Sequence, residues 1–281
     1  MEKFEKEFCH RYPNYAFLIR YMQAAIGKEE INWSDLTSTN LTDVVEYLTK
    51  TVTPNSASTY LAVIKGFLNM VSDEIDLPTM RFAKILRVKK TPQQNVALTE
   101  EEVKRIDDYY KVLLKKDKHK VEKDVLTLFL IECYCGSRGV DVENMTEDNI
   151  KDGMISYVSK KTHILAQIPE HYRIKDLFKR KPSKEYSRMT KNRIIKEVCK
   201  LCGIDDKVTL FYHGSMVTKK KYELVGQHTA RRSFSSILAA KGVPVPEISQ
   251  YMGHTSISMT ERYIKVDNKK ASPEALSFFK G

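Results

Sequence analysis

The spacing of hydrophobic residues in the first 88 positions predicts helices throughout this part of the chain. Apolar side chains recur every three or four residues, which is the period of a helix that buries one face. Gly27 and Pro54 stand at the ends of such stretches, as helix boundaries usually require. We predict helices at Phe17 to Gly27, at Leu41 to Lys50 behind Asn40 or Thr42 as cap, and at Ser56 to Ile75. Together they would form a small helical bundle.

A basic, polar and proline-containing stretch follows this bundle. Such a composition is typical of a linker between domains. A new helix is predicted directly after it, because Thr99 and Glu102 have the spacing of a capping box. We therefore predict a helical domain at residues 1–88, a linker at 89–97 and a second domain at 98–281.

The second domain mixes helices with a few short strands. The stretch from Asp124 to Cys135 is apolar nearly all round, which predicts a helix at the centre of this domain. The predicted helices are Thr99 to Leu114, Asp124 to Cys135 (the central one), Lys191 to Gly203 and His228 to Gly242; the strands are Met154 to Val158, Ile164 to Ile168 and Val208 to Tyr212; a basic loop is predicted at Lys219 to Tyr222. The predicted fold class is mainly α with a small β-sheet, that is, α+β.

Composition adds a partner class to this picture. The 281 residues carry a formal net charge of +11, and the first 88 are close to neutral, so the second domain holds the surplus. A strongly basic domain beside a neutral one favours a polyanion as partner, with its main contact on the second domain.

Other classes find little support in the sequence. The longest apolar run, at Val125 to Cys135, is too short for a membrane span and contains a Glu. The N-terminus has no apolar signal core, so we expect a cytoplasmic protein. Cys199 and Cys202 have zinc-like spacing but lack a matching second pair of ligands. We expect free thiols, with no metal and no cofactor.

Four short motifs carry candidate chemistry. His228 and Arg231 are three residues apart, so on a helix they share one face. Arg138 follows the buried helix directly, and Asp141 is placed to orient it. Lys160 and Lys161 occupy the turn between the two predicted strands.

The fourth motif is "MGHTSISMTERY", which contains His254 and Tyr263. One unbroken helix would place these two side chains on opposite faces. Gly253 is expected to end the first helix, and Ser258 with Glu261 is expected to cap a second helix that carries Tyr263. This break would allow both side chains to face one substrate.

These residue types suit the chemistry of a phosphodiester. Guanidinium groups match the two non-bridging oxygens, which gain charge in the transition state. A tyrosine that attacks phosphorus must lose its proton, which a histidine can accept, while a lysine or histidine protonates the departing oxygen.

The motifs "GSRGVD", "KKT", "HTARRSF" and "MGHTSISMTERY", in this order behind a helical domain, resemble those of the tyrosine recombinase (phage integrase) family. The chain looks closest to integrases of Bacteroides-type mobile elements. The resemblance implies a core-binding (SAM-like) DNA-binding domain at residues 1–88 and a catalytic domain at 98–281. The catalytic residues that it implies are Arg138, Lys161, His228, Arg231, His254 and Tyr263.

The resemblance also implies a role for each of these residues. Arg138 and Arg231 would hold the scissile phosphate, and His254 would hydrogen-bond it. Lys161, preferred over Lys160 for the family's common "KT" pairing, would be the general acid. His228 would assist proton transfer. Tyr263 would attack, which gives a 3′-phosphotyrosyl link.

The resemblance also implies that the partner of this chain is double-stranded DNA. Such enzymes act as homotetramers on two DNA sites, exchange strands through a Holliday junction, and in some cases use accessory bending or directionality factors. The C-terminal segment at Ser272 to Phe279 either packs on a neighbouring protomer or docks on its own subunit. Two other functions use the same residues or fold: DNA relaxation like that of a type IB topoisomerase, and DNA binding without catalysis.

Overall fold

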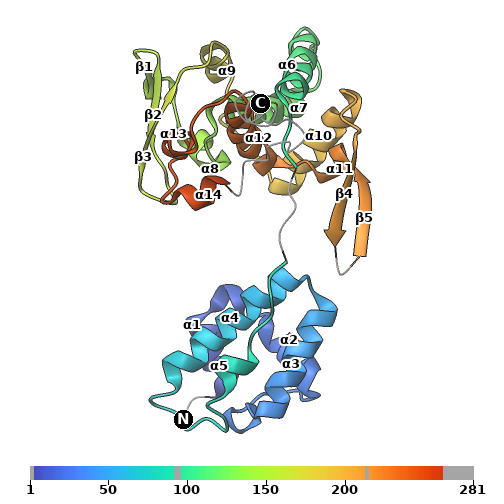
Figure 1. Ribbon diagram of the computed structural model, residues 1–281, viewed down its shortest axis with the longest axis vertical. Coiled ribbons are helices and arrows are strands. Elements are labelled where there is room, and N and C mark those ends of the chain that lie inside the picture. The colour runs from blue at the N-terminus through green and yellow to red at the C-terminus, as the bar shows by residue number, and fades with distance from the viewer. Residues whose placement is uncertain (1–2, 92–95, 213–214, 262–281) are drawn as a thin grey trace, which may run out of the picture. The chain divides into compact units, whose positions relative to one another are not determined.

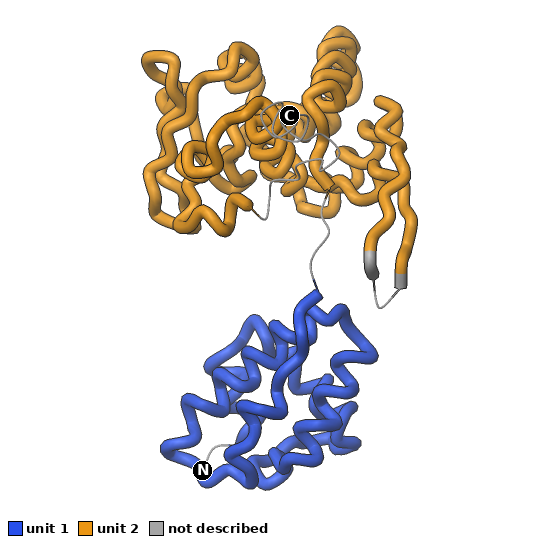
Figure 2. Tube along the Cα trace, in the orientation of Figure 1, with its two compact units in different colours: residues 1–93, 212–215 blue, residues 94–211, 216–281 orange. Residues whose placement is uncertain are grey.

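The computed structural model describes residues 3–91, 96–212 and 215–261. The chain divides into two compact units, residues 1–93 with 212–215 and residues 94–211 with 216–281 (Figure 2). Each unit has its own hydrophobic core. The assignment of residues 1–88, 89–97 and 98–281 to a DNA-binding domain, a linker and a catalytic domain stays a prediction.

The first unit is a helical bundle, as the hydrophobic spacing predicts (Figure 1). Its core contains a cluster of aromatic rings in which Phe67 lies 5.1 Å from Phe8 and 5.7 Å from Phe4, centroid to centroid. The elements are α1 (Phe4–Arg11), η1 (Pro13–Tyr15), α2 (Leu18–Ile26), η2 (Trp33–Asp35), α3 (Ser38–Thr51), α4 (Pro54–Val71) and α5 (Phe82–Ile85).

One helix start in this unit was predicted wrongly. α3 begins at Ser38, and the side chain of Thr37 caps it by accepting a hydrogen bond from Asn40 N at 3.2 Å. Asn40 and Thr42 therefore lie inside the helix, where Asn40 instead donates its side-chain amide to the carbonyl of Asp35 at 2.7 Å. Thr37 offers the same capping chemistry as Asn40 but lies one turn earlier.

The second unit confirms the predicted α+β class. Its elements are α6 (Glu100–Leu114), α7 (Lys120–Cys135), α8 (Gly139–Asn144), η3 (Glu147–Asn149), β1 (Ile150–Lys151), β2 (Met154–Val158), β3 (Leu165–Pro169), α9 (Ile174–Lys179), α10 (Arg188–Leu201), β4 (Lys207–Tyr212), β5 (Ser215–Lys220), α11 (Lys221–Leu224), α12 (Gln227–Ala240), α13 (Val245–Tyr251) and α14 (Ile257–Glu261). In this unit α7 is buried nearly all round, and α6, α8, α9, α10 and α12 pack against it. The predicted central helix is therefore confirmed.

The strands form two separate antiparallel sheets among the described residues. β1, β2 and β3 make a meander, in which Met154 pairs with Pro169 and Val158 with Leu165. β4 and β5 form a second pair. The predicted basic loop at Lys219 to Tyr222 was wrong, because Lys220 ends β5 and Lys221 begins α11.

No helix in the described ranges combines the length and the apolar character that crossing a membrane would need.

Candidate active site

Arg138 stands where α7 gives way to α8. α7 stops at Cys135, and Gly136 takes a left-handed conformation with φ 65° that turns the chain. Arg138 is then the residue just before α8, and its side chain is largely buried, with 13% exposed. The buried helix thus delivers a guanidinium group to the edge of the core.

A serine links Arg138 to Asp141. Arg138 Nη1 donates to Ser159 Oγ at 2.8 Å, and Ser159 Oγ donates to Asp141 Oδ2 at 3.1 Å. The direct distance from Arg138 Nη1 to Asp141 Oδ2 is 4.0 Å. Asp141 orients Arg138 as predicted, but largely through Ser159, which the sequence analysis missed.

Arg231 is buried completely, with none of its surface exposed. Its Nη1 donates to the carbonyl of Gly136 at 2.7 Å, and its Nη2 donates to the carbonyl of Met252. A guanidinium group cannot be neutralised at pH 7 and is costly to bury, so such bonds are needed to hold it there. The second predicted arginine therefore joins the end of α7 to the end of α13.

The turn after α13 places His254. Gly253 has φ 57°, its N–H donates to Gln250 O at 2.9 Å, and the N–H of His254 donates to Ser249 O at 3.1 Å. These two bonds define a Schellman motif, which ends a helix with glycine in the left-handed conformation. The predicted helix end at Gly253 is confirmed, and the imidazole Nδ1 lies 2.8 Å from Thr260 Oγ1.

The second helix of this pair does not start as predicted. α14 begins at Ile257, so Ser258 lies inside it, and the capping box of Ser258 with Glu261 was wrong. The N–H of Met259 instead donates to the carbonyl of Ser256 at 3.1 Å, which places the start of the helix two residues earlier than predicted. Tyr263 lies outside the described residues.

The two candidate lysines lie together on the turn between β2 and β3, and both are exposed. The turn is fixed at both sides: Lys160 N donates to Asp141 Oδ1 at 2.9 Å, and Thr162 Oγ1 donates to the carbonyl of Gly253 at 3.1 Å. The turn thus lies between the residues around Arg138 and the loop that carries His254. The choice between Lys160 and Lys161 stays open.

His228 lies in the first turn of α12, three residues before Arg231. The surrounding protein dehydrates the imidazole, and the guanidinium groups of Arg232, Arg231 and Arg138 repel a second positive charge. These effects lower the pKa of His228 to about 4, although the residue is exposed on the surface. His228 is therefore neutral at pH 7 and able to accept a proton.

His254 also feels the charges of Arg231 and Arg138 but is buried, with 8% exposed. Burial, followed by the charges of Arg231 and Arg138, lowers the pKa of its imidazole to about 3. The structure thus brings together four of the six predicted residues, and each of the two histidines is affected by both arginines. Two cations beside two neutral imidazoles can bind an oxyanion and exchange protons with it.

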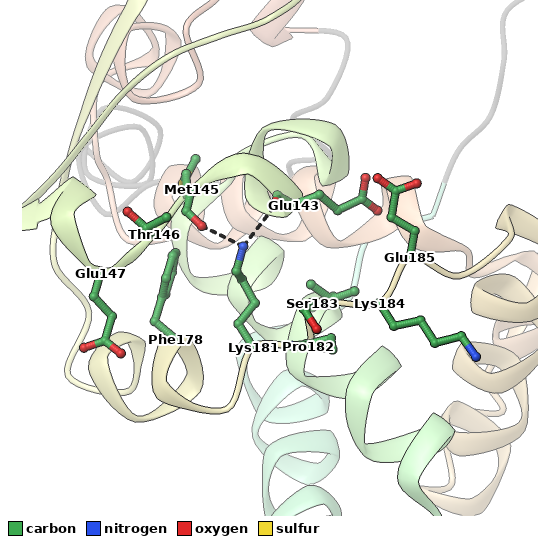
Figure 3. Close-up of a pocket in the computed structure, with 11 residues that line it drawn as sticks. Glu143, Met145, Thr146, Glu147, Phe178, Lys181, Pro182, Ser183, Lys184 and Glu185 are labelled. Atoms are coloured by element: carbon green, nitrogen blue, oxygen red, sulfur yellow. Dashed lines mark hydrogen bonds between the residues drawn. The ribbon is translucent and has the colours of Figure 1, made fainter.

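A pocket of about 340 Å³ lies at the other end of α8 (Figure 3). At its edge the ammonium group of Lys181 donates to the carbonyls of Val142, Glu143 and Met145, at 3.1, 2.9 and 2.6 Å. A cation at the C-terminal end of a helix satisfies carbonyls that have no partner inside the helix. Lys181 thereby anchors the short helix that follows Arg138, and none of the five predicted residues that the structure describes lines this pocket.

Comparisons with known proteins identify the family and the fold. The model of the phage integrase family matches residues 64–270. No curated protein matches the chain significantly. The narrower likeness to Bacteroides-type integrases stays a prediction.

Solved structures share the fold over nearly the whole chain. A lambda integrase dimer bound to a COC′ core site is 16% identical, with a TM-score of 0.67, and the match covers 94% of this chain and 91% of that one. A lambda integrase tetramer bound to a Holliday junction is 17% identical, with a TM-score of 0.64 and coverages of 95% and 74%. The Tn1549 transposon integrase in complex with a circular intermediate DNA is 12% identical, with a TM-score of 0.63 and coverages of 100% and 99%.

Proposed function

The chain belongs to the phage integrase family of tyrosine recombinases, and from this premise we propose that it cleaves and rejoins double-stranded DNA through Tyr263. The observation that carries the proposal is the meeting of Arg138, Arg231, His228 and His254 in one region of the second unit. Four residues from α12 and from the ends of α7 and α13 share one electrostatic environment there. A phosphodiester is the substrate that this set of groups fits.

The two arginines bind the scissile phosphate in this proposal. Arg231 is held rigidly by two carbonyls, and Arg138 is held by Ser159, so both positive charges are in place before the substrate arrives. Charges fixed in advance need no reorganisation when the pentacoordinate transition state forms. His254, whose Nδ1 lies against Thr260, hydrogen-bonds the same phosphate.

The remaining groups move protons. Tyr263 attacks phosphorus and forms a 3′-phosphotyrosyl bond, while the 5′ oxygen of the departing strand leaves. A phenol has a pKa of about 10, so it needs a base, and the neutral imidazole of His228 assists that transfer. Lys161, or Lys160 beside it, protonates the departing oxygen.

The covalent link conserves the energy of the broken phosphodiester bond. A 5′-hydroxyl from a second DNA strand attacks the phosphotyrosine and restores the tyrosine, so the reaction needs no external energy source. Two DNA duplexes exchange strands in this way through a Holliday junction. We propose a homotetramer on two DNA sites, with residues 1–88 as the core-binding domain. The formal charge of +11 supports DNA as partner, as do the DNA complexes among the structural neighbours.

A suicide substrate tests the nucleophile. On DNA with a nick beside the cleavage site, the released fragment diffuses away and the covalent adduct accumulates. We expect the wild-type protein to form the adduct, Tyr263→Phe to bind the DNA without forming it, and Tyr251→Phe to form it as the wild type does. Tyr251 is a matched control, because its hydroxyl is engaged by Glu247 on α13. An adduct with Tyr263→Phe would disprove the assignment.

A further inference from the structure

Gln227 holds the first turn of α12 at two points. Its backbone N–H donates to Asn192 Oδ1 on α10 at 2.9 Å, and its side-chain Nε2 donates to Glu132 Oε1 on α7 at 2.8 Å. Gln227 immediately precedes His228, so the start of the helix that carries His228 and Arg231 is fixed to two neighbouring helices.

The carboxyl partner is unusual because Glu132 is buried, with 1% exposed. Burial raises the pKa of Glu132 to about 8, while the amide of Gln227 and the charges of Lys191 and Arg231 oppose this rise and the charge of Glu143 adds to it. A buried acid is costly, and an apolar side chain would stabilise the core of α7 better. A function in orienting its neighbour explains its presence.

A glycine makes room for this contact. A Cβ added to Gly139 would lie 1.9 Å from Gln227 Nε2 and 3.0 Å from Glu132 Oε1. Real Cβ atoms do not approach other atoms to 1.9 Å, so any side chain at this position would displace the amide. Gly139 is the first residue of α8 and directly follows Arg138. The amide of Gln227 therefore fills the space between the backbone beside Arg138 and the acid on α7.

We propose that Gln227 and Glu132 are positioning residues for DNA cleavage, which set the start of α12 against the start of α8. Arg138 precedes Gly139, and His228 follows Gln227, so this one contact fixes the spacing between a group that binds the phosphate and a group that assists proton transfer. The inference rests on the function proposed above. Its energetic reason is that a misplacement of about 1 Å in an active site can cost about 100-fold in rate.

The first test measures cleavage on the suicide substrate at saturating DNA. We expect Gln227→Ala to lower the rate of adduct formation about 10- to 100-fold, with DNA affinity within about twofold of the wild type. Gln23→Ala is the matched control, since Gln23 Nε2 makes the same kind of bond to Glu5 Oε1, at 2.9 Å, in the first unit. It should leave the rate unchanged.

Four further variants separate positioning from general damage. Gly139→Ala should lower the rate like Gln227→Ala, and the double variant should be no slower than the worse single variant, because both remove one contact. Glu132→Gln should keep most of the rate, because its amide oxygen still accepts from Gln227, whereas Glu132→Leu should not. Multiplying effects of Gly139→Ala and Gln227→Ala, or a wild-type rate for Gln227→Ala, would overturn the proposal.

A second readout does not depend on cleavage. In DNA-free protein, an NMR titration of His228 should show its lowered pKa. Gln227→Ala should return this pKa toward 6.5, because a displaced first turn exposes the imidazole to water and moves it away from Arg138. Gln23→Ala should leave it unchanged. An unchanged His228 pKa in Gln227→Ala would contradict the inference about positioning. The absence of an adduct with the wild-type protein is a separate outcome, and it would disprove the proposed function.

Discussion

The buried side chains of residues 3–91 are almost all hydrophobic, whereas charged and hydroxyl groups lie throughout the core of residues 96–261. In the first unit, Asp35 is the one polar or charged residue among those described as buried. In the second unit, Arg231, Glu132 and Asp141 are buried within or beside the main cluster of apolar residues. The first core is built for stability, and the second gives up part of that stability to hold charges in fixed places.

The largest expected effect comes from a substitution in the second unit, and it is on the rate of DNA cleavage. Arg231→Ala removes a charge that we propose binds the phosphate, and it leaves the carbonyls of Gly136 and Met252 without this donor. We expect adduct formation on the suicide substrate to fall about 1,000-fold, which is the loss seen when a preorganised donor of an oxyanion is removed. A rate within tenfold of the wild type would show that the buried arginine is structural.

A substitution in the core of the first unit should lower stability without changing the cleavage rate. Leu61 on α4 is fully buried, and Leu61→Ala removes its side chain from an apolar core. We expect the free energy of unfolding of that unit to fall by about 3 kcal/mol, measured by urea denaturation. The cleavage rate of the folded protein at saturating DNA should stay unchanged. A large loss of rate at that saturation would show that the two units do not divide stability and chemistry in this way.

The effect that is smallest per pH unit is a pH dependence of stability that comes from Glu132. Its pKa is about 8 in the folded protein and about 4.5 when unfolded, so the stability that it contributes below pH 4.5 is lost as the pH rises toward 8. We expect Glu132→Gln to gain stability relative to the wild type over this range, by at most about 1.4 kcal/mol per pH unit. Urea denaturation of both proteins between pH 5 and pH 8.5 measures the difference, and parallel pH profiles would contradict it.

Local signals in the sequence predicted the elements well. The strand at Met154–Val158 follows from a short run rich in β-branched and aromatic residues. The start of α6 follows from Thr99 and Glu102, whose reciprocal hydrogen bonds are 2.7 and 3.2 Å long. These features are decided within a few residues, so the chain alone contains them. The start of α3 was missed because Thr37, Asn40 and Thr42 all offer capping chemistry.

Contacts between residues far apart in the chain could not be predicted from local patterns in the sequence. Arg138 could be found because an arginine beside an apolar element indicates an anionic partner, and Arg231 because it lies three residues after His228 on a predicted helix. Ser159 and Gln227 are ordinary polar residues until the fold brings them to Arg138 and to Glu132, 21 and 95 positions earlier in the chain. Their roles depend on tertiary packing, which leaves no mark in local composition or spacing.

The hydrogen bond from Arg231 to the Met252 carbonyl makes the position of the Arg231 guanidinium depend on α13. Met252 lies between α13 and the turn that presents His254, so α13 must dock before Arg231 has both of its carbonyl partners. A guanidinium group that is hydrogen-bonded through one terminal nitrogen has more freedom, and binds an anion less well, than one that is hydrogen-bonded through both. The position of the charge on Arg231 thus depends on the docking of α13.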